Sequence, residues 1–518
     1  MTPSEVPVTL PLVPLPEHVE VLDLPPFTLT AETVVEVDRA GDEVGRRLAS
    51  RLGALVGAGL ALEVEVSDGP GAGVGSAGEG RPRIRVRVED QGRAGETAPT
   101  CGAALRPVPG AYALRVVPGE VDLVARERTG LLHGLATLAQ LVQHPLSRIA
   151  ACQVVDAPRY PWRGLSLDLA RRFHGPATVR TVIDVMASLK LGVLHLHLTD
   201  DQGWRLEIPS RPELTARSGG TAVDGGPAGF LTVEEYAGLV AYAAERGVVV
   251  VPEIDLPGHV NAALHACPEL NPSGQAAPPY TGIEVGFSRL DATLPATDAF
   301  LVDVLDDVAA MTPGPWVHLG GDEALASDPE EYRVLVTRAA EILRAAGKEV
   351  VGWQELARLS LGPGSAVQYW TSEQDPGPVV AAALAGADVV MSPASRTYLD
   401  LKYDATTALG LEWAGHVEVR DSYDWDPDLV LPLPAERVRG VEAALWSETL
   451  RTPGDLFHML LPRLAAVAEV AWTPQHRRDW AGFAARVPTV AAAWDRAGLA
   501  WYRSPQITWH PAAPPVTS

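Results

Sequence analysis

From residue 162 to residue 446, short apolar runs alternate with segments in which apolar residues recur at helical spacing. A short apolar run between turn residues is typical of a buried strand, and a recurrence every three to four residues is typical of an amphipathic helix. Strands are predicted at residues 164–168, 192–198, 248–254, 316–319, 349–353, 366–369, 387–391 and 440–446. Helices are predicted between most of them, including 178–189, 232–245, 297–311 and 332–346. Strands that alternate with helices form a parallel sheet, and a series of this length predicts a (β/α)8 barrel.

The residues before this barrel have a different pattern, which predicts a smaller α/β domain. Helical spacing is found over 46–60 and 129–142, and strand-like runs lie at 62–66, 83–88, 111–117 and 120–125. The Gly-rich stretch 67–81 predicts a surface loop. We therefore predict an N-terminal α/β domain (1–155), a catalytic (β/α)8 TIM barrel (156–500) with further helical segments at 462–471 and 480–496, and a C-terminal tail (501–518).

The composition narrows the classes of partner. The chain has 518 residues, a formal net charge of −23 and 47% hydrophobic residues. A strongly acidic protein repels nucleic acids and anionic lipids and favours neutral or cationic ligands. No apolar run reaches the length that spans a bilayer. We therefore expect neither nucleic acid nor a membrane as a partner.

Cysteine usage and the N-terminus bear on the compartment. Cys101, Cys152 and Cys267 are too few and too scattered for a disulfide scaffold or a zinc knuckle. Residues 1–17 lack the basic and apolar segments of a signal peptide. The sequence as it stands predicts a cytoplasmic protein, and a secreted one if its N-terminus has been trimmed.

Polar and aromatic side chains follow the predicted strands at the points where they end. In a (β/α)8 barrel the C-terminal ends of the strands form the catalytic face, so we expect these side chains to share one site. They include Asp168, Arg171, Asp200, Glu253, Asp255, His259, Asp322, Glu323, Trp353, Glu355, Trp370, Trp446 and Glu448. Tryptophan rings cover the apolar face of a sugar, and carboxylates and arginines bind its hydroxyl groups. The pattern favours a polyhydroxylated ligand.

Asp322 and Glu323 are the leading candidates for catalysis, because they follow a predicted strand and a Gly-Gly pair. Hydrolysis of a glycoside needs an acid for the leaving oxygen and a group that stabilises an oxocarbenium-like centre. Neighbouring side chains in extended backbone point in different directions, so these two carboxylates are poorly placed to face each other across one bond. They are better placed to contact different parts of one substrate, with Glu323 at the glycosidic oxygen and Asp322 at a 2-substituent.

Over residues 105–475 the chain resembles the family 20 glycoside hydrolases, the β-N-acetylhexosaminidases. The motifs that carry the resemblance are Arg163-Gly with Asp168 and Arg171, His195-Leu-His-Leu-Thr-Asp-Asp-Gln-Gly-Trp204, Pro252-Glu-Ile-Asp-Leu-Pro-Gly-His259, His318-Leu-Gly-Gly-Asp-Glu323, Gly352-Trp-Gln-Glu355, Gln368-Tyr-Trp370, Tyr398-Leu-Asp400 and Leu445-Trp-Ser-Glu448. The family commonly has His after the Arg of the first-strand motif, whereas here Arg172-Phe173-His174 follows Arg171.

The resemblance implies a retaining, exo-acting enzyme. It would remove terminal non-reducing β-linked GlcNAc, or GalNAc, from oligosaccharides such as chito-oligosaccharides, with no cofactor and no metal, as a monomer or homodimer. Glu323 would act as acid and then as base, and Asp322 would orient and polarise the acetamido N–H. The acetamido oxygen would attack the anomeric carbon to form an oxazolinium intermediate, with Tyr398 hydrogen-bonded to that oxygen. Such substrate-assisted enzymes are exceptions to the two-carboxylate rule.

The same resemblance implies the substrate contacts. Trp353, Trp370 and Trp446 would line the acetamido pocket, and Trp413 would help to close it. Arg163 and Glu448 would bind the 3- and 4-hydroxyls of the ring, and Asp400 the 4- or 6-hydroxyl. Asp200 and His259 would support Arg163 and Glu323 from behind.

Three other hypotheses are compatible with parts of the pattern. His195 and His197 form an H-x-H pair, as in metal-dependent barrel hydrolases. Both imidazoles are expected on one face of their strand, with Asp200 on the other and no convincing further ligands, so structural histidines are favoured. A non-catalytic sugar-binding protein would have no need of the acid. A family member that releases disaccharide units or modified hexosamines is disfavoured by the expected contacts to the 3- and 4-hydroxyls.

Overall fold

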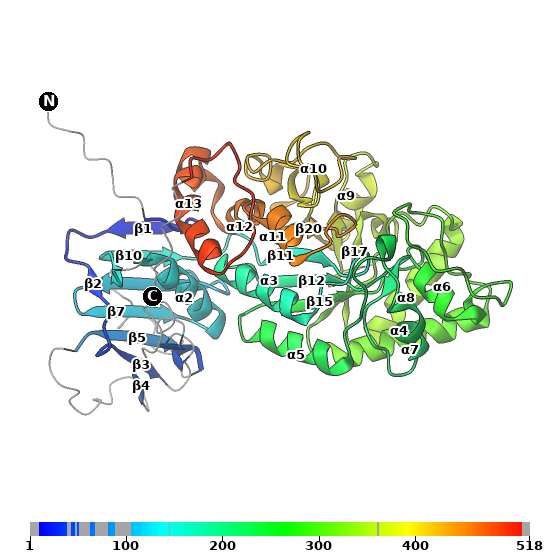
Figure 1. Cartoon of the computed structure of the whole chain (residues 1–518), viewed down its shortest axis with the longest axis horizontal. Coiled ribbons are helices and arrows are strands. Elements are labelled where there is room, and N and C mark those ends of the chain that lie inside the picture. The colour runs from blue at the N-terminus through cyan, green and yellow to red at the C-terminus, as the bar shows by residue number, and fades with distance from the viewer. Residues whose placement is uncertain are drawn as a thin grey trace.

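The computed structural model describes residues 10–38, 43–46, 49–50, 63–67, 81–88, 105–143, 146–359 and 362–509. The chain forms two domains, the smaller one on the left of Figure 1 and the barrel on the right. The first domain contains a seven-stranded sheet with strand order β1-β10-β6-β7-β5-β3-β4. The bounds of these strands are β1 (His18–Val21), β3 (Val34–Asp38), β4 (Glu63–Ser67), β5 (Arg83–Val88), β6 (Tyr112–Val117), β7 (Glu120–Ala125) and β10 (Cys152–Asp156). A second small sheet consists of β2 (Phe27–Thr28), β8 (Val142–Gln143) and β9 (Arg148–Ile149).

The second domain is a closed barrel of eight parallel strands, which confirms the predicted fold class. Its strands are β11 (Trp162–Asp168), β12 (Val193–His197), β15 (Val249–Glu253), β16 (Trp316–His318), β17 (Glu349–Trp353), β18 (Ala366–Tyr369), β19 (Asp388–Met391) and β20 (Val438–Leu445). The barrel closes where β20 pairs with β11. At that seam Gly440 has φ 158°, and an added Cβ would lie 1.8 Å from the carbonyl oxygen of Trp162. A larger residue would therefore push the two closing strands apart.

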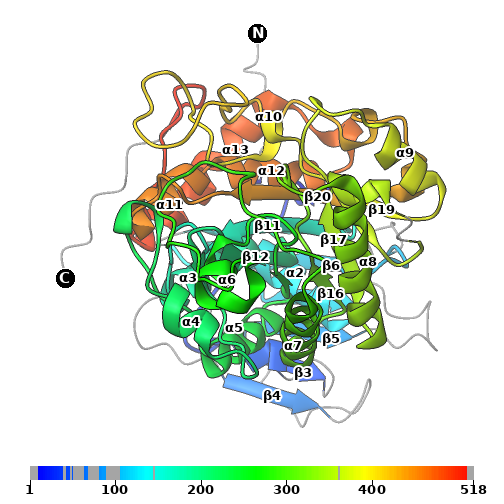
Figure 2. The same ribbon diagram turned by 90° about the vertical axis from the view of Figure 1, so that its right-hand side faces the viewer.

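Helices surround the strands, as Figure 2 shows from the side opposite the N-terminal domain. The longer ones are α3 (Pro176–Ser188), α5 (Val233–Ala244), α7 (Pro295–Met311), α8 (Pro329–Ala345), α9 (Gly377–Leu384), α11 (Pro453–Leu460), α12 (Arg463–Trp472) and α13 (Trp480–Arg496). Shorter ones are α4 (Glu213–Ser218), α6 (Asn261–Ala266) and α10 (Ala394–Thr397). Their ends follow local chemistry: Thr232 and Glu235 form a capping box at the start of α5, which satisfies backbone N–H groups that have no helical partner.

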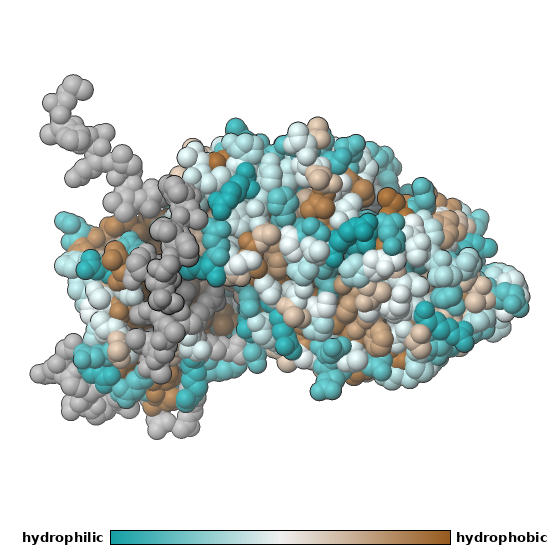
Figure 3. Space-filling model, in the orientation of Figure 1, coloured by the Kyte–Doolittle hydropathy of each residue, from teal (hydrophilic) through white to brown (hydrophobic). Residues whose placement is uncertain are grey.

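The burial of the barrel strands explains why they could be predicted from the sequence. All residues of β11, β12 and β18 are buried. Strands covered by helices outside and by packed side chains inside have no solvent-facing side, so they appear as continuous apolar runs. On the face of the barrel that Figure 3 shows, hydrophilic and hydrophobic residues are interspersed.

The two domains meet at the end of the barrel where the strands begin. Helix α2 (Arg128–Leu141) of the first domain lies beside the barrel there. The ammonium group of Lys190 lies 2.8 Å from the carboxylate of Asp156, which also accepts a hydrogen bond from the indole of Trp472. All three side chains are buried. The N-terminal domain is thus fixed at the end of the barrel opposite the catalytic face.

A few predictions fall partly outside the described residues. Most of the helix predicted at 46–60 and of the loop at 67–81 lies there, as does Cys101. Cys152 and Cys267 are buried free thiols. Within the described part of the chain, none of the helices has the length and apolarity needed to cross a bilayer.

Candidate active site

The chain leaves β16 in an unusual backbone conformation that brings Asp322 and Glu323 to the catalytic face. Gly320 and Gly321 have φ values of 64° and 93°, and Glu323 has φ 45°. A Cβ on Gly320 would lie 1.9 Å from a carboxylate oxygen of Asp255. The backbone N–H of Gly321 donates to the same carboxylate at 3.0 Å. Glycine is therefore required by the left-handed backbone and by the close approach of Asp255.

The two adjacent carboxylates have different environments. The side chain of Asp322 is largely buried, whereas that of Glu323 is 33% exposed. Burial, followed by the negative charges of Glu323 and Glu355, raises the pKa of Asp322 to about 7, although nearby His259 opposes the shift. Asp322 thus faces the protein interior, while Glu323 lies at an opening, where it can exchange a proton with a substrate or water.

A row of charged side chains lies behind Glu323. The Nε2 atom of His259 lies 3.5 Å from Glu323, and its Nδ1 atom lies 3.2 Å from Asp200. Asp200 also forms an ion pair with Arg171 at 2.8 Å. Burial alone would lower the pKa of His259, but the carboxylates of Asp200 and Asp255 hold it well above the usual value. A protonated His259 is therefore expected beside Glu323, where its ring can donate a hydrogen bond to that carboxylate.

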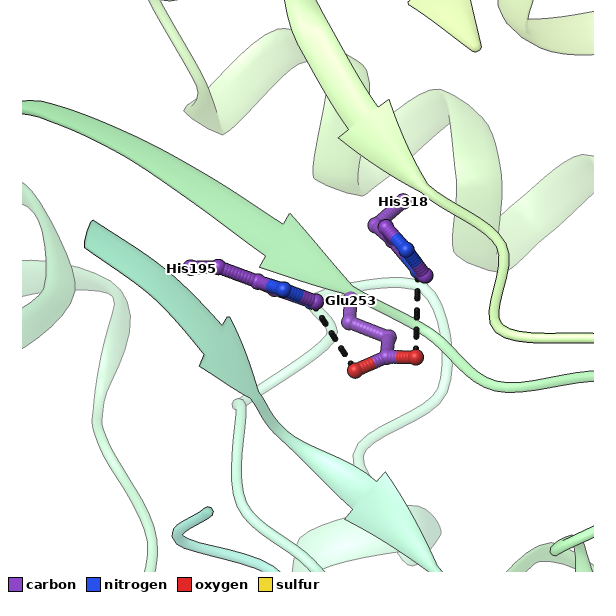
Figure 4. Close-up of side chains that lie close together, drawn as sticks. All are labelled: His195, Glu253 and His318. Atoms are coloured by element: carbon purple, nitrogen blue, oxygen red, sulfur yellow. Dashed lines mark ion pairs between the residues drawn. The ribbon is translucent and has the colours of Figure 1, made fainter. Parts of the chain in front are cut away.

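Deeper in the barrel than this row of charged side chains, Glu253 forms the centre of a buried cluster of imidazoles. Figure 4 shows its carboxylate between His195 at 2.9 Å and His318 at 3.1 Å. It also lies 2.6 Å from His197 and accepts a hydrogen bond from the indole of Trp353 at 3.0 Å. The other ring nitrogen of His195 lies 2.9 Å from Glu442, and these carboxylates overcome burial to raise the pKa of His195 to about 9. Both histidines of the H-x-H pair therefore have carboxylate partners that account for their burial.

One geometric expectation about this cluster is wrong. Asp200 does not lie on the opposite face from the histidines, since its carboxylate is 2.9 Å from Nε2 of His197. The alternation of faces holds only within a regular strand. β12 ends at His197, and Asp200 belongs to the short hairpin strand β13 (Thr199–Asp200), which pairs with β14 (Gly203–Trp204).

Five aromatic side chains form one wall of the site, and all five were predicted to contact the substrate. Trp353, Trp370 and Trp446 follow or end the strands β17, β18 and β20, whereas Tyr398 and Trp413 lie in the segment after β19. The Tyr398 ring lies 6.4 Å from Trp370, 5.8 Å from Trp413 and 6.0 Å from Trp446 between ring centroids. Trp353 lies 5.8 Å from Trp446. This ring cluster can enclose a small group such as a methyl or an amide.

Asp400 and Glu448 supply the acidic end of the site. Asp400 is buried, and neither of its carboxylate oxygens has a hydrogen-bond partner among the described residues. Burial and the nearby charge of Glu448 raise the pKa of Asp400 well above its usual value. A buried carboxylate without donors is costly unless a ligand supplies them. Its position is therefore consistent with the predicted contact to a sugar hydroxyl.

The prediction for Arg163 is wrong. This residue lies at the start of β11, at the end of the barrel that faces the N-terminal domain. Its guanidinium donates to the carbonyl oxygens of Lys190, Tyr160 and Pro161 at 2.8–3.2 Å and lies 5.0 Å from the centre of the Trp472 ring. A side chain at the beginning of a barrel strand is a full strand length from the catalytic face.

Arg171 takes the place that was predicted for Arg163. It follows the end of β11, forms the ion pair with Asp200, and lies with its guanidinium 4.9 Å from the centre of the Trp446 ring. Asp200 accordingly supports Arg171 and not Arg163. The signal that distinguishes the two arginines was in the sequence, because one precedes the predicted strand and the other follows it.

Replacement of Arg163 by Met is expected to lower the thermal midpoint while leaving KM and kcat near the native values. The substitution leaves the buried carbonyl oxygens of Lys190 and Tyr160 without this donor, at a cost of about 1–3 kcal/mol for each group that stays unsatisfied. Thermal unfolding and steady-state kinetics measure the two effects separately. A large rise in KM with unchanged stability would restore Arg163 to the substrate site.

Arg172, the departure from the family pattern, has a clear place. It donates through Nε to the backbone carbonyl oxygen of Glu448 at 2.9 Å and through a terminal nitrogen to that of Val223 at 3.0 Å. A further ion pair joins it to Asp224. Arg172 therefore connects the segment that carries Glu448 to the loop after β14, and it does not disturb Arg171.

The chain is similar to known proteins over nearly its whole length. Residues 160–475 match the family model described as "Glycosyl hydrolase family 20, catalytic domain". Residues 9–157 match the model described as "Glycosyl hydrolase family 20, domain 2". The chain is 51% identical over 504 residues to a β-N-acetylhexosaminidase of Cellulomonas fimi, which covers 96% of this chain and 97% of that protein. A β-hexosaminidase of Vibrio furnissii is 36% identical over 397 residues, with 69% of this chain and 64% of that protein covered.

Solved structures give the same result. The β-N-acetylhexosaminidase of Streptomyces coelicolor A3(2) superposes with a TM-score of 0.87 at 40% identity, over 97% of this chain and 99% of that chain. A mutant β-hexosaminidase of Streptomyces plicatus in complex with the product GlcNAc has a TM-score of 0.86 at 40% identity, over 97% and 98% of the two chains.

Proposed function

The chain belongs to glycosyl hydrolase family 20 and is a glycoside hydrolase with β-N-acetylhexosaminidase activity; from this premise we propose that it releases one terminal non-reducing β-linked GlcNAc with retention of configuration. The nucleophile would be the acetamido oxygen of the substrate. The observation that carries the proposal is the different placement of the adjacent carboxylates. Asp322 is largely buried, and together with burial its negative charge raises the pKa of Tyr398 in the aromatic wall, whereas Glu323 is 33% exposed.

In the first step, Glu323 donates its proton to the glycosidic oxygen while the acetamido oxygen attacks the anomeric carbon. The bond between that carbon and the leaving oxygen breaks, and an oxazolinium ion forms. Asp322 accepts a hydrogen bond from the acetamido N–H and balances the positive charge that develops on this group, while the Tyr398 hydroxyl donates to the acetamido oxygen. Charge stabilisation of this kind, in a site closed by aromatic rings, is a large contribution to catalysis.

In the second step, Glu323 acts as a base. Its carboxylate removes a proton from water, the resulting nucleophile attacks the anomeric carbon, and the oxazolinium ring opens to give GlcNAc. His259 lies beside the Glu323 carboxylate in both steps and is itself oriented by Asp200. Two displacements at one carbon give overall retention.

The substrate's hydroxyl groups are assigned to the acidic end of the site. Arg171 and Glu448 would bind the 3- and 4-hydroxyls, and Asp400 the 4- or 6-hydroxyl. Because no hydrogen bond reaches either carboxylate oxygen of Asp400 within the described part of the chain, the carboxyl group can accept from an equatorial or an axial hydroxyl. On this basis we include GalNAc as a second substrate. A comparison of 4-nitrophenyl N-acetyl-β-glucosaminide with the galactosaminide tests this, and no cleavage of the second would limit the enzyme to GlcNAc.

The central experiment compares 4-nitrophenyl N-acetyl-β-glucosaminide with the matching β-glucoside in the presence of a chelator. Rapid hydrolysis of the first and none of the second is expected, since only the first contains the nucleophile. Equal hydrolysis of both would refute the substrate-assisted mechanism. If the chelator abolished activity on the first, the cluster around Glu253 would have to be reconsidered as a metal centre.

The acidic limb of the pH profile tests the state of Asp322. Because ionised Asp322 is the form that accepts the acetamido N–H, kcat/KM is expected to rise with pH through the pKa of about 7 that burial and nearby carboxylates give this group. Replacement of Glu355 by Gln removes one of those negative charges, so the limb is expected to move to lower pH. The amide oxygen of Gln can still accept from Trp370, as Glu355 does. An unchanged limb, or one moved to higher pH, would contradict the assignment.

A further inference from the structure

The position of the acid defines the side on which the leaving group departs. A general acid must lie within hydrogen-bond distance of the atom that it protonates. If Glu323 protonates the glycosidic oxygen, as the proposed function requires, the leaving group passes over the surface next to Glu323. The inference below rests on that assignment.

The surface next to Glu323 is unusually apolar. Leu325, two residues along the chain, is 80% exposed. The segment between α6 and α7 adds Ile283 at 49%, Val285 at 39% and Phe287 at 46% exposure. The ring of Tyr280 lies 4.6 Å from that of Phe287. We call these five residues the rim surface. Exposed large apolar side chains gathered at one place on a soluble protein mark a binding site more often than isolated ones do.

The rim surface is continuous with the catalytic loop. Gly286, with φ 78°, lies so close to that loop that an added Cβ would be 2.8 Å from Cδ1 of Leu325 and 3.2 Å from the carbonyl oxygen of Glu323. The segment around Gly286 and the segment that carries Glu323 and Leu325 are therefore in direct contact. The rim surface thus adjoins the opening at which Glu323 lies.

Hydrogen bonds hold the rim surface in a defined shape. The amide of Gln202 donates to the carbonyl oxygen of Gly282 at 2.9 Å, and the hydroxyl of Tyr280 accepts from the backbone N–H of Glu284 at 2.8 Å. The hydroxyl of Ser288 donates to Asp201, whose carboxylate also accepts from the N–H of Asn261. A surface fixed to the loops that follow β12 and β15 loses little conformational entropy when a ligand covers it.

We propose that the rim surface is a subsite for the leaving group and that it favours leaving groups with an alkyl or aryl chain. Four of its five side chains are hydrocarbon only, and the hydroxyl of the fifth already accepts from the backbone. A second sugar would need donors and acceptors for its hydroxyl groups. An alkyl or aryl chain needs only apolar contact, which this surface provides, at up to ~0.8 kcal/mol per buried methylene, or a factor of about four.

Kinetics on a series of alkyl N-acetyl-β-glucosaminides from methyl to octyl test the proposal. The leaving alcohols have similar acidity, so a change in kcat/KM along the series reports contact with the protein and not chemistry. We expect kcat/KM to rise with chain length, by at least about tenfold from methyl to octyl if two or more methylenes are buried. A flat series for the native enzyme would overturn the proposal.

The variants are Leu325→Ser and Phe287→Ser, with Leu384→Ser as the matched control. Leu384 is 71% exposed at the C-terminal end of α9, and helices of a barrel end near the opposite face. Each rim variant is expected to reduce the octyl-to-methyl ratio at least threefold, with the rate on the methyl glycoside and the thermal midpoint preserved. The control should keep the native ratio. An unchanged ratio in both rim variants, or an equal loss in the control, would overturn the proposal.

Two further measurements separate the possible failures. Inhibition constants for octyl and methyl 1-thio-β-N-acetylglucosaminides report binding without catalysis, and tighter octyl binding that the rim variants abolish is expected. If the native enzyme failed to hydrolyse the methyl glycoside, that result would instead contradict the proposed function. Hydrolysis of N,N′-diacetylchitobiose identifies the occupant. A fall in its kcat/KM as large as that for the octyl glycoside would mean that the rim surface holds a second sugar, which overturns the preference for apolar chains.

Discussion

Replacement of Glu323 by Gln is expected to lower kcat/KM for methyl N-acetyl-β-glucosaminide by about 10²–10⁴-fold, the usual contribution of general acid catalysis. Gln has nearly the same shape but has no proton of suitable acidity to give to an alkoxide. The loss should be much smaller for a leaving group such as 2,4-dinitrophenolate, which departs without protonation. The dependence of kcat/KM on the acidity of the leaving group should therefore be steeper in the variant than in the native enzyme.

The control for this experiment is His259→Gln. Since His259 is buried behind Glu323, at 3.5 Å from its carboxylate, its loss should shift the pH profile and lower the rate moderately on all leaving groups. Equal losses of Glu323→Gln on activated and unactivated substrates would exclude Glu323 as the acid.

Replacement of Asp322 by Asn is expected to lower kcat by about 10²–10³-fold, the range found when one preorganised charge-stabilising group is lost. The acetamido group would lose the carboxylate that orients it and balances its developing charge. Substrates with a fluorinated acetyl group give a second measurement. In the native enzyme, kcat should fall as fluorine withdraws electrons from the nucleophilic oxygen, because that oxygen forms the new bond.

The same variant should not be less stable. A carboxyl group whose pKa is raised in the folded protein binds protons more tightly there than in the unfolded chain. Its contribution to stability is therefore lost as pH rises, and above pH 7 the buried charge is a cost that Asn removes. At pH 8 the variant is expected to melt at or above the native midpoint. A variant with normal kcat would contradict the catalytic role proposed for Asp322. A variant that fails to fold would contradict the expected effect of its buried charge on stability.

The sequence was most informative where burial imposes a pattern. The strand predicted at 349–353 coincides with β17, and the helix predicted at 480–496 coincides with α13. The strand predicted at 440–446 is β20, which begins two residues earlier at Val438. Ends of elements depend on local capping and pairing and not on periodicity, so they were less well defined.

The site residues were predictable for a different reason. Residues that end or directly follow a barrel strand share one face, so the sequence alone predicts that Asp322, Glu323 and Trp353 lie together. Arg163 shows the limit of this reasoning. The motif that contains it spans both ends of β11, and only the direction of the strand distinguishes the arginine at the catalytic face from the arginine at the domain interface.

Other features follow from contacts that no short sequence window contains. The position of Asp200 beside His197 depends on a turn after the strand. The meeting of Lys190 with Asp156 joins residues from different domains. The rim surface joins Leu325 to a loop that precedes it by about one βα unit. In each case the contact is determined by the three-dimensional fold, and the local pattern of apolar and polar residues does not specify it.

The attachment of the N-terminal domain at the rear of the barrel has a practical consequence. A tether at that domain, whether a covalent support, a fused module or an antibody, would leave the mouth of the barrel facing outward. Immobilised in this orientation, the enzyme should digest the ends of polymers presented on a second surface, such as a particle or a cell wall. The same enzyme attached through the loops beside Glu323 would be restricted to substrates small enough to diffuse beneath it.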